Sequence, residues 1–230
     1  MRLVLIRHGQ TPSNVLGLLD TAPPGPGLTD LGAAQAAAVP DTVGAEPIEA
    51  IYASTAVRAQ QTAIPLAQRR GLEITIRHDL REIAAGEWEM QDDDLSVRGY
   101  LGVIGGWMAG RLQDRTPGPN GESGAEVLER FDDVVREVVG TGVAGAALVA
   151  HGAVNRFWAS TRATNLEDGF GAVNPLRNTG IVVLSGDLEQ GWTAHSWTGA
   201  QVGAGLVGAT PSAPGDEDPF DDAIPVPARP

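Results

Sequence analysis

The chain has 230 residues, a net charge of −13 and no cysteine. That length suits one α/β domain with a sizeable core, or a domain with one small lobe. The negative charge argues against general binding to nucleic acid, which demands clustered Lys and Arg, and against docking on anionic membranes. The absence of cysteine excludes thiol catalysis, disulfides and thiolate metal sites.

The first predicted element is a buried strand from Leu3 to Ile6, which runs directly into Arg7, His8 and Gly9. A short apolar run with branched residues is typical of a buried strand. Open α/β sheets bind their ligands at the carboxyl ends of strands, which is where these polar residues fall. No long apolar segment precedes Arg7, so neither a signal peptide nor a membrane span is expected, and the cytoplasm is the expected location.

Helices and strands then alternate along the chain. Residues 14–27 are rich in Gly and Pro and predict a loop, after which Thr29 is expected to cap a helix to about Val39. A short strand is predicted at 50–53. Ser54 or Thr55 is expected to cap the next helix, which Pro65 should bend and Gly71 should end.

The second half continues the alternation, with one unclear stretch. A strand is predicted at 74–76, whereas residues 90–121 show no clear period. Ser123 and Glu126 have capping-box spacing and predict a helix to about Val139. A buried strand at 147–150 ends at His151, and a helix should follow through Trp158. Strands at 181–184 and 193–197 are expected to form an edge hairpin.

This order of elements predicts a single domain over residues 1–205. Strands that alternate with helices favour a three-layer α/β/α sandwich with a mainly parallel central sheet. The acidic, Pro-rich tail at 206–230 lacks the apolar content needed to pack and is expected to be disordered.

Four separate segments place a reactive side chain where a predicted strand ends. Arg7 and His8 follow the first strand, Arg58 lies one turn into the helix after the second, Glu82 follows the third, and His151 follows the strand at 147–150. Because the carboxyl ends of parallel strands share one sheet edge, these residues can converge. Two histidines, two arginines and a carboxyl group suit phosphoryl transfer, with charge neutralisation, nucleophilic attack and proton handling divided among them.

With these residues in place, the chain resembles branch 1 of the histidine phosphatase superfamily, which includes phosphoglycerate mutases and phosphatases similar to them. The resemblance covers roughly residues 1–200, and the ordered recurrence of several motifs makes it specific. The motifs are Arg7-His8-Gly9-Gln10-Thr11 with Asn14, Leu28-Thr29-Asp30-Leu31-Gly32, Ser54 with Arg58 and Gln61-Thr62-Ala63, Leu80-Arg81-Glu82-Ile83, Gly86-Glu87-Trp88-Glu89, Gly121-Glu122-Ser123 and Val149-Ala150-His151-Gly152.

The resemblance implies a phosphoglycerate mutase-like fold and a role for each matching residue. His8 would be the nucleophile that forms a phosphohistidine, and Glu82 would protonate the leaving oxygen and then activate water. Arg7, Arg58 and His151 would hold the phosphoryl oxygens, and Asn14 would add a hydrogen bond. Glu87 and Glu89 compete with Glu82 for the acid role. Glu122 either serves the turn before a helix or braces the pocket. Neither cofactor nor metal is implied.

Three departures from the family pattern bear on the substrate. Asp20-Thr21 stands where many relatives carry a glutamine-glycine pair, so Asp20 either points away from the phosphate or reads a hydroxyl or amine of the substrate. Met90 replaces a usual glycine. Residues 90–121 lack the arginine pair of mutases, although Arg98, Arg111 and Arg115 lie in or near this stretch.

These features favour a phosphomonoester hydrolase acting on a small phosphorylated metabolite. A cofactor-dependent phosphoglycerate mutase is the alternative within the same class. A catalytically silent phospholigand-binding protein is the alternative in a different class, although every expected active-site position is filled. The oligomeric state is not specified by the sequence.

Overall fold

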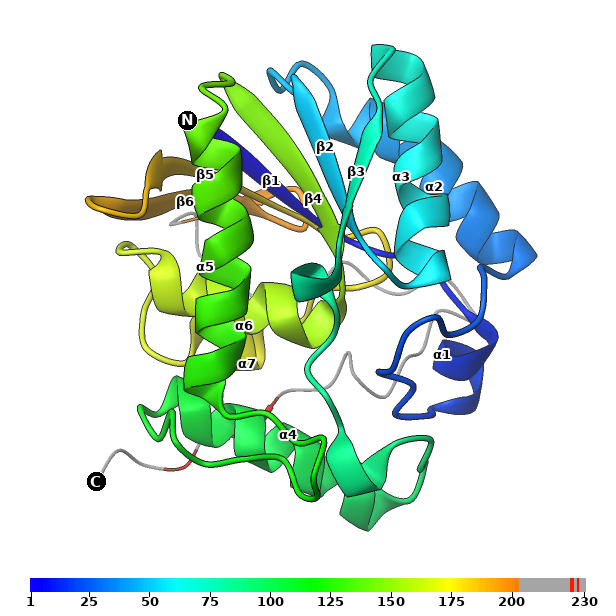
Figure 1. The fold of residues 1–230 in the computed structure, drawn as a ribbon, viewed down its shortest axis with the longest axis vertical. Helices are drawn as coiled ribbons and strands as arrows, with labels where there is room; N and C mark the ends of the chain where they lie inside the picture. Colours follow the sequence, from blue (N-terminus) through cyan, green and yellow to red (C-terminus); the bar gives the residue numbers. More distant parts are fainter. Residues whose placement is uncertain (203–223, 226, 228–230) are drawn as a thin grey trace.

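The fold is built on one mixed, seven-stranded sheet with helices on both faces (Figure 1). A computed structural model describes residues 1–202, 224, 225 and 227. The strand order is β3-β2-β4-β1-β5-β6-β7. The strands are β1 (Arg2–Arg7), β2 (Ala50–Ser54), β3 (Ile74–Arg77), β4 (Gly145–Ala150), β5 (Ile181–Asp187), β6 (Gly191–Trp197) and β7 (Ala200–Gln201).

The register of the central strands sets the position of the two candidate histidines. β1 pairs in parallel with β4, and Arg7 lies opposite Ala150. The next residue of each strand is a histidine, so His8 and His151 leave the sheet side by side. β2 and β3 extend the parallel part, whereas β5, β6 and β7 complete the sheet as antiparallel strands. The expected hairpin of β5 and β6 is therefore confirmed, although β7 lies outside it at the edge of the sheet.

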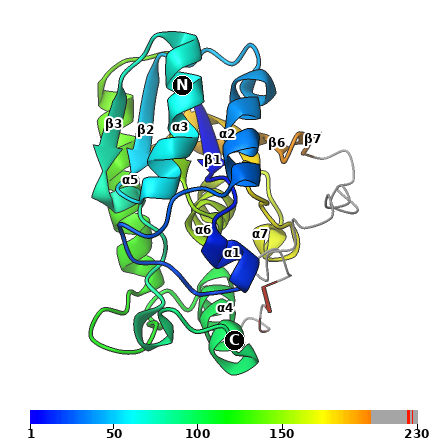
Figure 2. The same ribbon diagram turned by 90° about the vertical axis from the view of Figure 1, so that its right-hand side faces the viewer.

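Each face of the sheet is covered by helices, which confirms the three-layer α/β sandwich (Figure 2). α2 (Asp30–Val43) and α3 (Val57–Arg70) pack on one face, and α5 (Gly124–Gly140) and α6 (Gly152–Arg162) pack on the other. Side chains of a strand alternate between faces. Leu3 and Leu5 of β1 accordingly join the core under α5 and α6, whereas Val4 and Ile6 join the core under α2 and α3.

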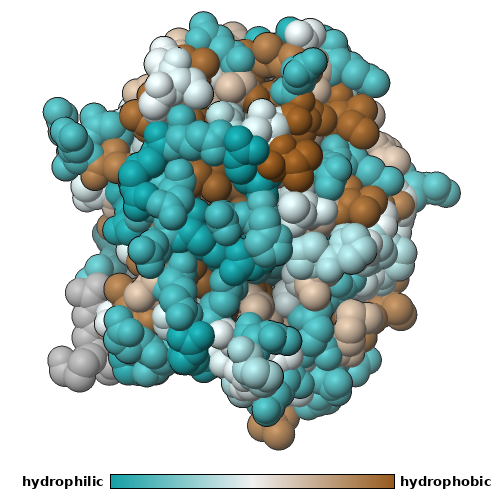
Figure 3. All heavy atoms as spheres, viewed as in Figure 1, coloured by the Kyte–Doolittle hydropathy of each residue, from teal (hydrophilic) through white to brown (hydrophobic). Residues whose placement is uncertain are grey.

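The α5 helix shows how pattern and capping act together. Ser123 accepts a hydrogen bond from the Glu126 backbone, and the Glu126 side chain accepts one from the Ser123 backbone, so the predicted capping box is confirmed. Its inward residues are buried against the sheet, whereas Glu129, Asp133 and Arg136 are exposed. The surface over α5 is accordingly mainly hydrophilic (Figure 3).

The carboxyl edge of the sheet is closed by short elements and by one helix that the sequence did not reveal. The short elements are α1 (Pro12–Leu16), the 3₁₀ turns η1 (His78–Leu80) and η2 (Gly86–Trp88), and α7 (Phe170–Val173). Residues 94–108 form the helix α4 (Asp94–Met108), which Asp93 caps by accepting hydrogen bonds from Leu95 N and Ser96 N. Residues 90–121, which the sequence pattern left unassigned, therefore contain a full helix.

Several predicted boundaries are wrong, among them the end of α6, which continues past Trp158 to Arg162. α2 continues past Val39 through Pro40 to Val43, whose side chain is buried in the core. Neither Ser54 nor Thr55 caps α3; its N-cap is Ala56, which makes no side-chain capping bond. Ser54 is instead turned toward His151. Gly71 does end α3, in the left-handed conformation.

Most of the tail at 206–230, expected to be disordered, lies outside the described residues. Ile224, which belongs to it, is 2% exposed, and its backbone N–H donates to Ala172 O. Within the described part of the chain, no helix is long and apolar enough to cross a membrane.

Candidate active site

One pocket at the carboxyl edge of the sheet brings together side chains from distant parts of the chain. The pocket and the open solvent at its mouth together occupy about 440 Å³. Arg7 and His8 reach it from the end of β1, Arg58 from α3 and Glu82 from the segment after η1. The parallel strand ends thus converge as the topology requires.

His8 is held in the form that leaves one ring nitrogen available for attack. Its Nδ1 lies 2.8 Å from Gly9 O, and because a carbonyl oxygen only accepts, Nδ1 must carry the proton. The lone pair of the neutral ring is then on Nε2. Burial, followed by the charges of Arg58 and Arg7, lowers the pKa of His8 well below its ordinary value. The imidazole is therefore neutral and nucleophilic at neutral pH.

The backbone around His8 is fixed by residues of two recognised motifs. Thr62 Oγ1 accepts from Gly9 N at 2.9 Å and donates to Arg58 O at 2.7 Å. A Cβ built on Gly9 would lie 2.6 Å from Gly32 O. The absence of a side chain at Gly9 is thus required for the close approach of the α2 N-terminus to the strand end.

The two arginines are buried beside His8, each with its guanidinium oriented by backbone carbonyls. Arg7 donates from Nη1 to Leu176 O at 2.8 Å, and a Cβ on Gly152 would lie 3.0 Å from Arg7 Nε. Arg58 donates from Nη2 to Asp20 O at 2.9 Å. Its Nη1 is buried without a hydrogen-bond partner in the described part of the chain. Buried cationic donors of this kind match the charge and geometry of a phosphate.

His151 lies behind His8, with no exposed surface. The two ring centroids are 5.2 Å apart, in an edge-to-face arrangement. His151 Nε2 is 2.9 Å from Ser54 Oγ, whereas Nδ1 is buried and has no hydrogen-bond partner among the described residues. Burial first, then Arg58 and His8, lower the pKa of His151 well below its ordinary value.

Glu82 lies on the pocket wall at the N-terminus of α6. Its carboxylate accepts hydrogen bonds from the backbone N–H groups of Ile83, Ala153 and Val154. Those bonds favour the ionised form, but burial outweighs them and raises the pKa of Glu82. A carboxyl group with a raised pKa at the pocket wall is suited to general acid–base chemistry.

The two competing acids are used elsewhere. Glu89 accepts from the backbone of Thr21 and of Ala22, both at 2.9 Å, and so ties down the loop that follows α1. Glu87 is exposed, and its backbone N–H donates to Pro117 O. Neither residue lines the pocket, whereas Glu82 does.

Asn14 lies in the pocket and also stabilises local structure. Its Oδ1 accepts from Thr11 N at 3.0 Å and completes the capping box of α1. Asn178 Nδ2 donates to His8 O at 3.1 Å, so Asn178 supports the same strand end from the other side. No motif in the sequence pointed to Asn178.

A buried ion-pair cluster behind Glu82 was not anticipated in full. Glu122 accepts from Arg130 Nε at 2.8 Å, from Arg81 Nη2 at 2.5 Å and from Ala84 N at 3.0 Å. Arg130 donates to the backbone oxygens of Asp79, Arg81 and Glu82. Glu122 therefore braces the segment that carries Glu82. Arg130 was missed because its partners are distant in sequence.

Replacing Glu122 with alanine is expected to destabilise the protein by about 3–5 kcal/mol, because the buried Arg130 loses its counter-ion. Urea unfolding measures the change in the free energy of unfolding. Asp41→Ala, which breaks an exposed pair with Arg69, should change it by less than about 1 kcal/mol. Equal effects of the two substitutions would show that the buried cluster is not a bracing element.

Together these groups form a pocket with two buried arginines, a neutral imidazole and a carboxyl group at its wall. Arg7 and Arg58 can neutralise a phosphoryl group while His8 Nε2 attacks it, and Glu82 can supply a proton. Three arginines that could have served a second acidic group lie elsewhere. Arg98, Arg111 and Arg115 are each exposed and paired with Asp94, Asp114 and Glu126 respectively.

Comparisons with known proteins agree with this chemistry. The sequence profile described as histidine phosphatase superfamily (branch 1) matches residues 3–199. A PE-PGRS family protein of Mycobacterium tuberculosis, PE_PGRS11, is 35% identical over 213 residues, which cover 86% of this chain and 36% of that protein. The glucosyl-3-phosphoglycerate phosphatase of the same species is 34% identical over 143 residues, 60% of either chain. This chain thus spans less than two thirds of the length of either relative.

A solved structure extends the similarity to the whole fold. The mycobacterial glucosyl-3-phosphoglycerate phosphatase in complex with VO3 superposes with a TM-score of 0.68 at 28% identity, covering 86% of this chain and 98% of that one.

Proposed function

The chain belongs to the histidine phosphatase superfamily (branch 1), and from that premise we propose that it is a phosphomonoester hydrolase acting through a phosphohistidine on a small phosphorylated metabolite. The observation that carries the proposal is the orientation of His8. Its Nδ1 is tied to Gly9 O, which leaves Nε2 as the nucleophile beside two buried arginines.

Each residue has a role in the proposed reaction. His8 Nε2 attacks phosphorus while the bond to the leaving oxygen breaks, and Glu82 donates its proton to that oxygen. Water then attacks the phosphohistidine, and Glu82, now ionised, accepts its proton. Arg7, Arg58 and His151 hold the phosphoryl oxygens, with Asn14 as a further donor, and stabilise the charge of the transition state.

The arginines outside the pocket favour hydrolysis over mutase activity. A mutase must also hold the second anionic group of its substrate, and none of Arg98, Arg111 and Arg115 lines the pocket.

A panel of alkyl and sugar phosphates, assayed for released phosphate, tests this function. We expect turnover of at least one ester. We expect the bisphosphate to stimulate no isomerisation of phosphoglycerate. Absence of turnover by the correctly folded protein would contradict the hydrolase. Stimulated isomerisation would instead identify a mutase.

A further inference from the structure

Asp20 lies in the pocket beside the cation proposed to hold phosphate. Its side chain is 9% exposed, and its Oδ1 is 3.8 Å from Arg58 Nη1. Ser13 Oγ donates to its Oδ2 at 2.6 Å. The carboxylate therefore does not point away from the site, which excludes one of the two possibilities that the sequence left open.

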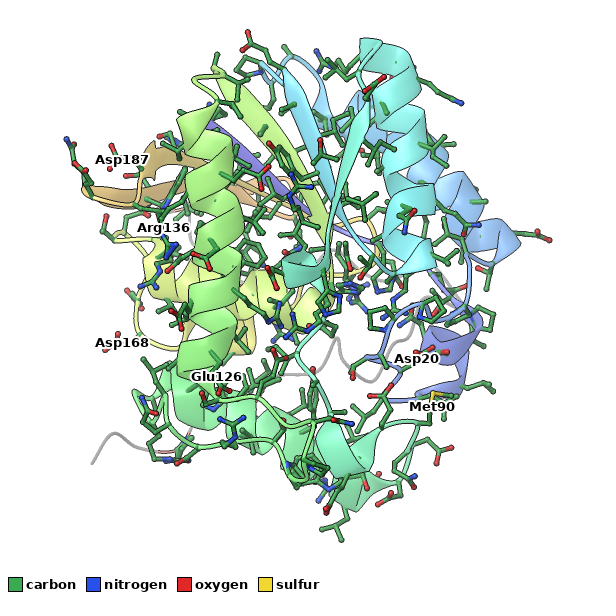
Figure 4. All side chains as sticks on the ribbon, viewed as in Figure 1. Asp20, Met90, Glu126, Arg136, Asp168 and Asp187 are labelled. Carbon is green, nitrogen blue, oxygen red and sulfur yellow. The ribbon has the colours of Figure 1, made fainter. Side chains whose placement is uncertain are left out.

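The residues before and after Asp20 are both held by hydrogen bonds to residues 89–91. Glu89 holds the next residues, and Leu19 exchanges backbone hydrogen bonds with Met90 and Gln91. Figure 4 shows Asp20 and Met90 close together on these two segments. Met90 has a φ of 62°, a conformation that suits the glycine usual there. The carboxylate therefore sits at a defined point on the pocket wall.

A fixed carboxylate beside the phosphate site discriminates between leaving groups. When the phosphoryl group is bound by the two arginines, the Asp20 carboxylate repels any further anionic group nearby. A hydroxyl or ammonium group could instead donate a hydrogen bond to its carboxylate oxygens.

We propose that Asp20 is a specificity-determining residue, which selects phosphate monoesters whose leaving group is uncharged or cationic and carries a hydroxyl or ammonium donor, and which rejects those with a carboxylate. This inference rests on the proposed hydrolase function. It separates this pocket from one built for phosphoglycerate-like substrates.

Asp20 could alternatively do no more than position Arg58, whose Nη2 donates to its backbone oxygen. If Asp20 only positions Arg58, its substitution should weaken the binding of every phosphate ester by the same factor. A specificity role changes the ratio between esters. Two substrates of equal size therefore separate the roles.

Glycerol 3-phosphate and 3-phosphoglycerate form such a pair, because they differ only in a hydroxymethyl group against a carboxylate. Their Kd values are measured by calorimetry on His8→Ala, which prevents turnover, with and without Asp20→Asn. In the variant that keeps Asp20, we expect glycerol 3-phosphate to bind about 30-fold tighter than 3-phosphoglycerate. In the variant that also carries Asp20→Asn, the two Kd values should agree within about threefold. Glu73→Gln, an exposed residue before β3, removes the same charge and should leave the ratio unchanged.

A ratio that Asp20→Asn leaves unaltered, or tighter binding of 3-phosphoglycerate with Asp20 present, would overturn the inference. Turnover of the same esters by the wild-type protein is measured in parallel. Its absence would defeat the hydrolase function, whereas the binding ratio still decides the role of Asp20.

Discussion

Replacing His8 with alanine is expected to lower kcat/KM for every phosphate ester by about 10⁴-fold or more, because a covalent route is lost with its nucleophile. Folding should survive, since the ring makes few structural bonds and the backbone of residue 8 keeps its bond to Ala150 O. Steady-state phosphate release measures the rate.

The same variant tests the intermediate directly. Brief exposure of the wild-type protein to a ³²P-labelled ester, followed by quenching in alkali, should leave label on the protein that acid removes. His8→Ala should carry none, whereas His195→Ala, which changes an exposed histidine of β6, should label as the wild type does. Persistent label on His8→Ala would assign the nucleophile to another residue.

The convergence of the site could be predicted because it follows from topology. Apolar runs ending in Arg7-His8 and in Ala150-His151 indicate buried strands, and parallel pairing must bring their ends together. The register of β1 on β4 does so, with Arg7 opposite Ala150. The capping box of Ser123 and Glu126 could also be predicted, because its two partners are close in sequence.

The α4 helix could not be predicted from local preference. Its sequence contains Gly99, Gly102, Gly105 and Gly106, and glycine disfavours helices. Tertiary contacts explain two of them: a Cβ on Gly99 would lie 2.6 Å from the Trp88 ring, and one on Gly105 would lie 2.0 Å from Pro225 O. Close packing against distant parts of the chain thus outweighs propensity here.

The partners of individual polar side chains could not be predicted from the sequence either. Ser54 has a hydroxyl that could cap a helix, yet this hydroxyl contacts His151, which follows the neighbouring strand β4. Glu122 could have served its own turn, but its partners Arg81 and Arg130 come from separate elements. Such choices depend on neighbours that are remote in sequence, so a motif can identify the residue without fixing its role.

Replacing Glu82 with glutamine is expected to slow alkyl phosphates by about 10²- to 10⁴-fold, because a poor leaving oxygen needs a proton as its bond to phosphorus breaks. p-Nitrophenyl phosphate should phosphorylate His8 with a much smaller loss, since its leaving group departs unprotonated. Hydrolysis of the phosphohistidine would still lack its base. We therefore expect a burst of nitrophenolate release followed by a slow steady-state rate. Rapid-quench kinetics resolve the two phases.

The pH profile gives a second, independent readout of the same residue. Because the pKa of Glu82 is raised, it remains a proton donor above the ordinary carboxyl range, and kcat/KM should fall as pH rises through that pKa. Because the pKa of His8 is lowered, protonation of the nucleophile should limit activity only at lower pH. Glu82→Gln should lose the basic limb alone, whereas the exposed Glu87→Gln should keep both. The ionisation of the substrate, common to all three proteins, is measured separately and divided out of each profile. A basic limb that then survives in Glu82→Gln would show that another group is the acid.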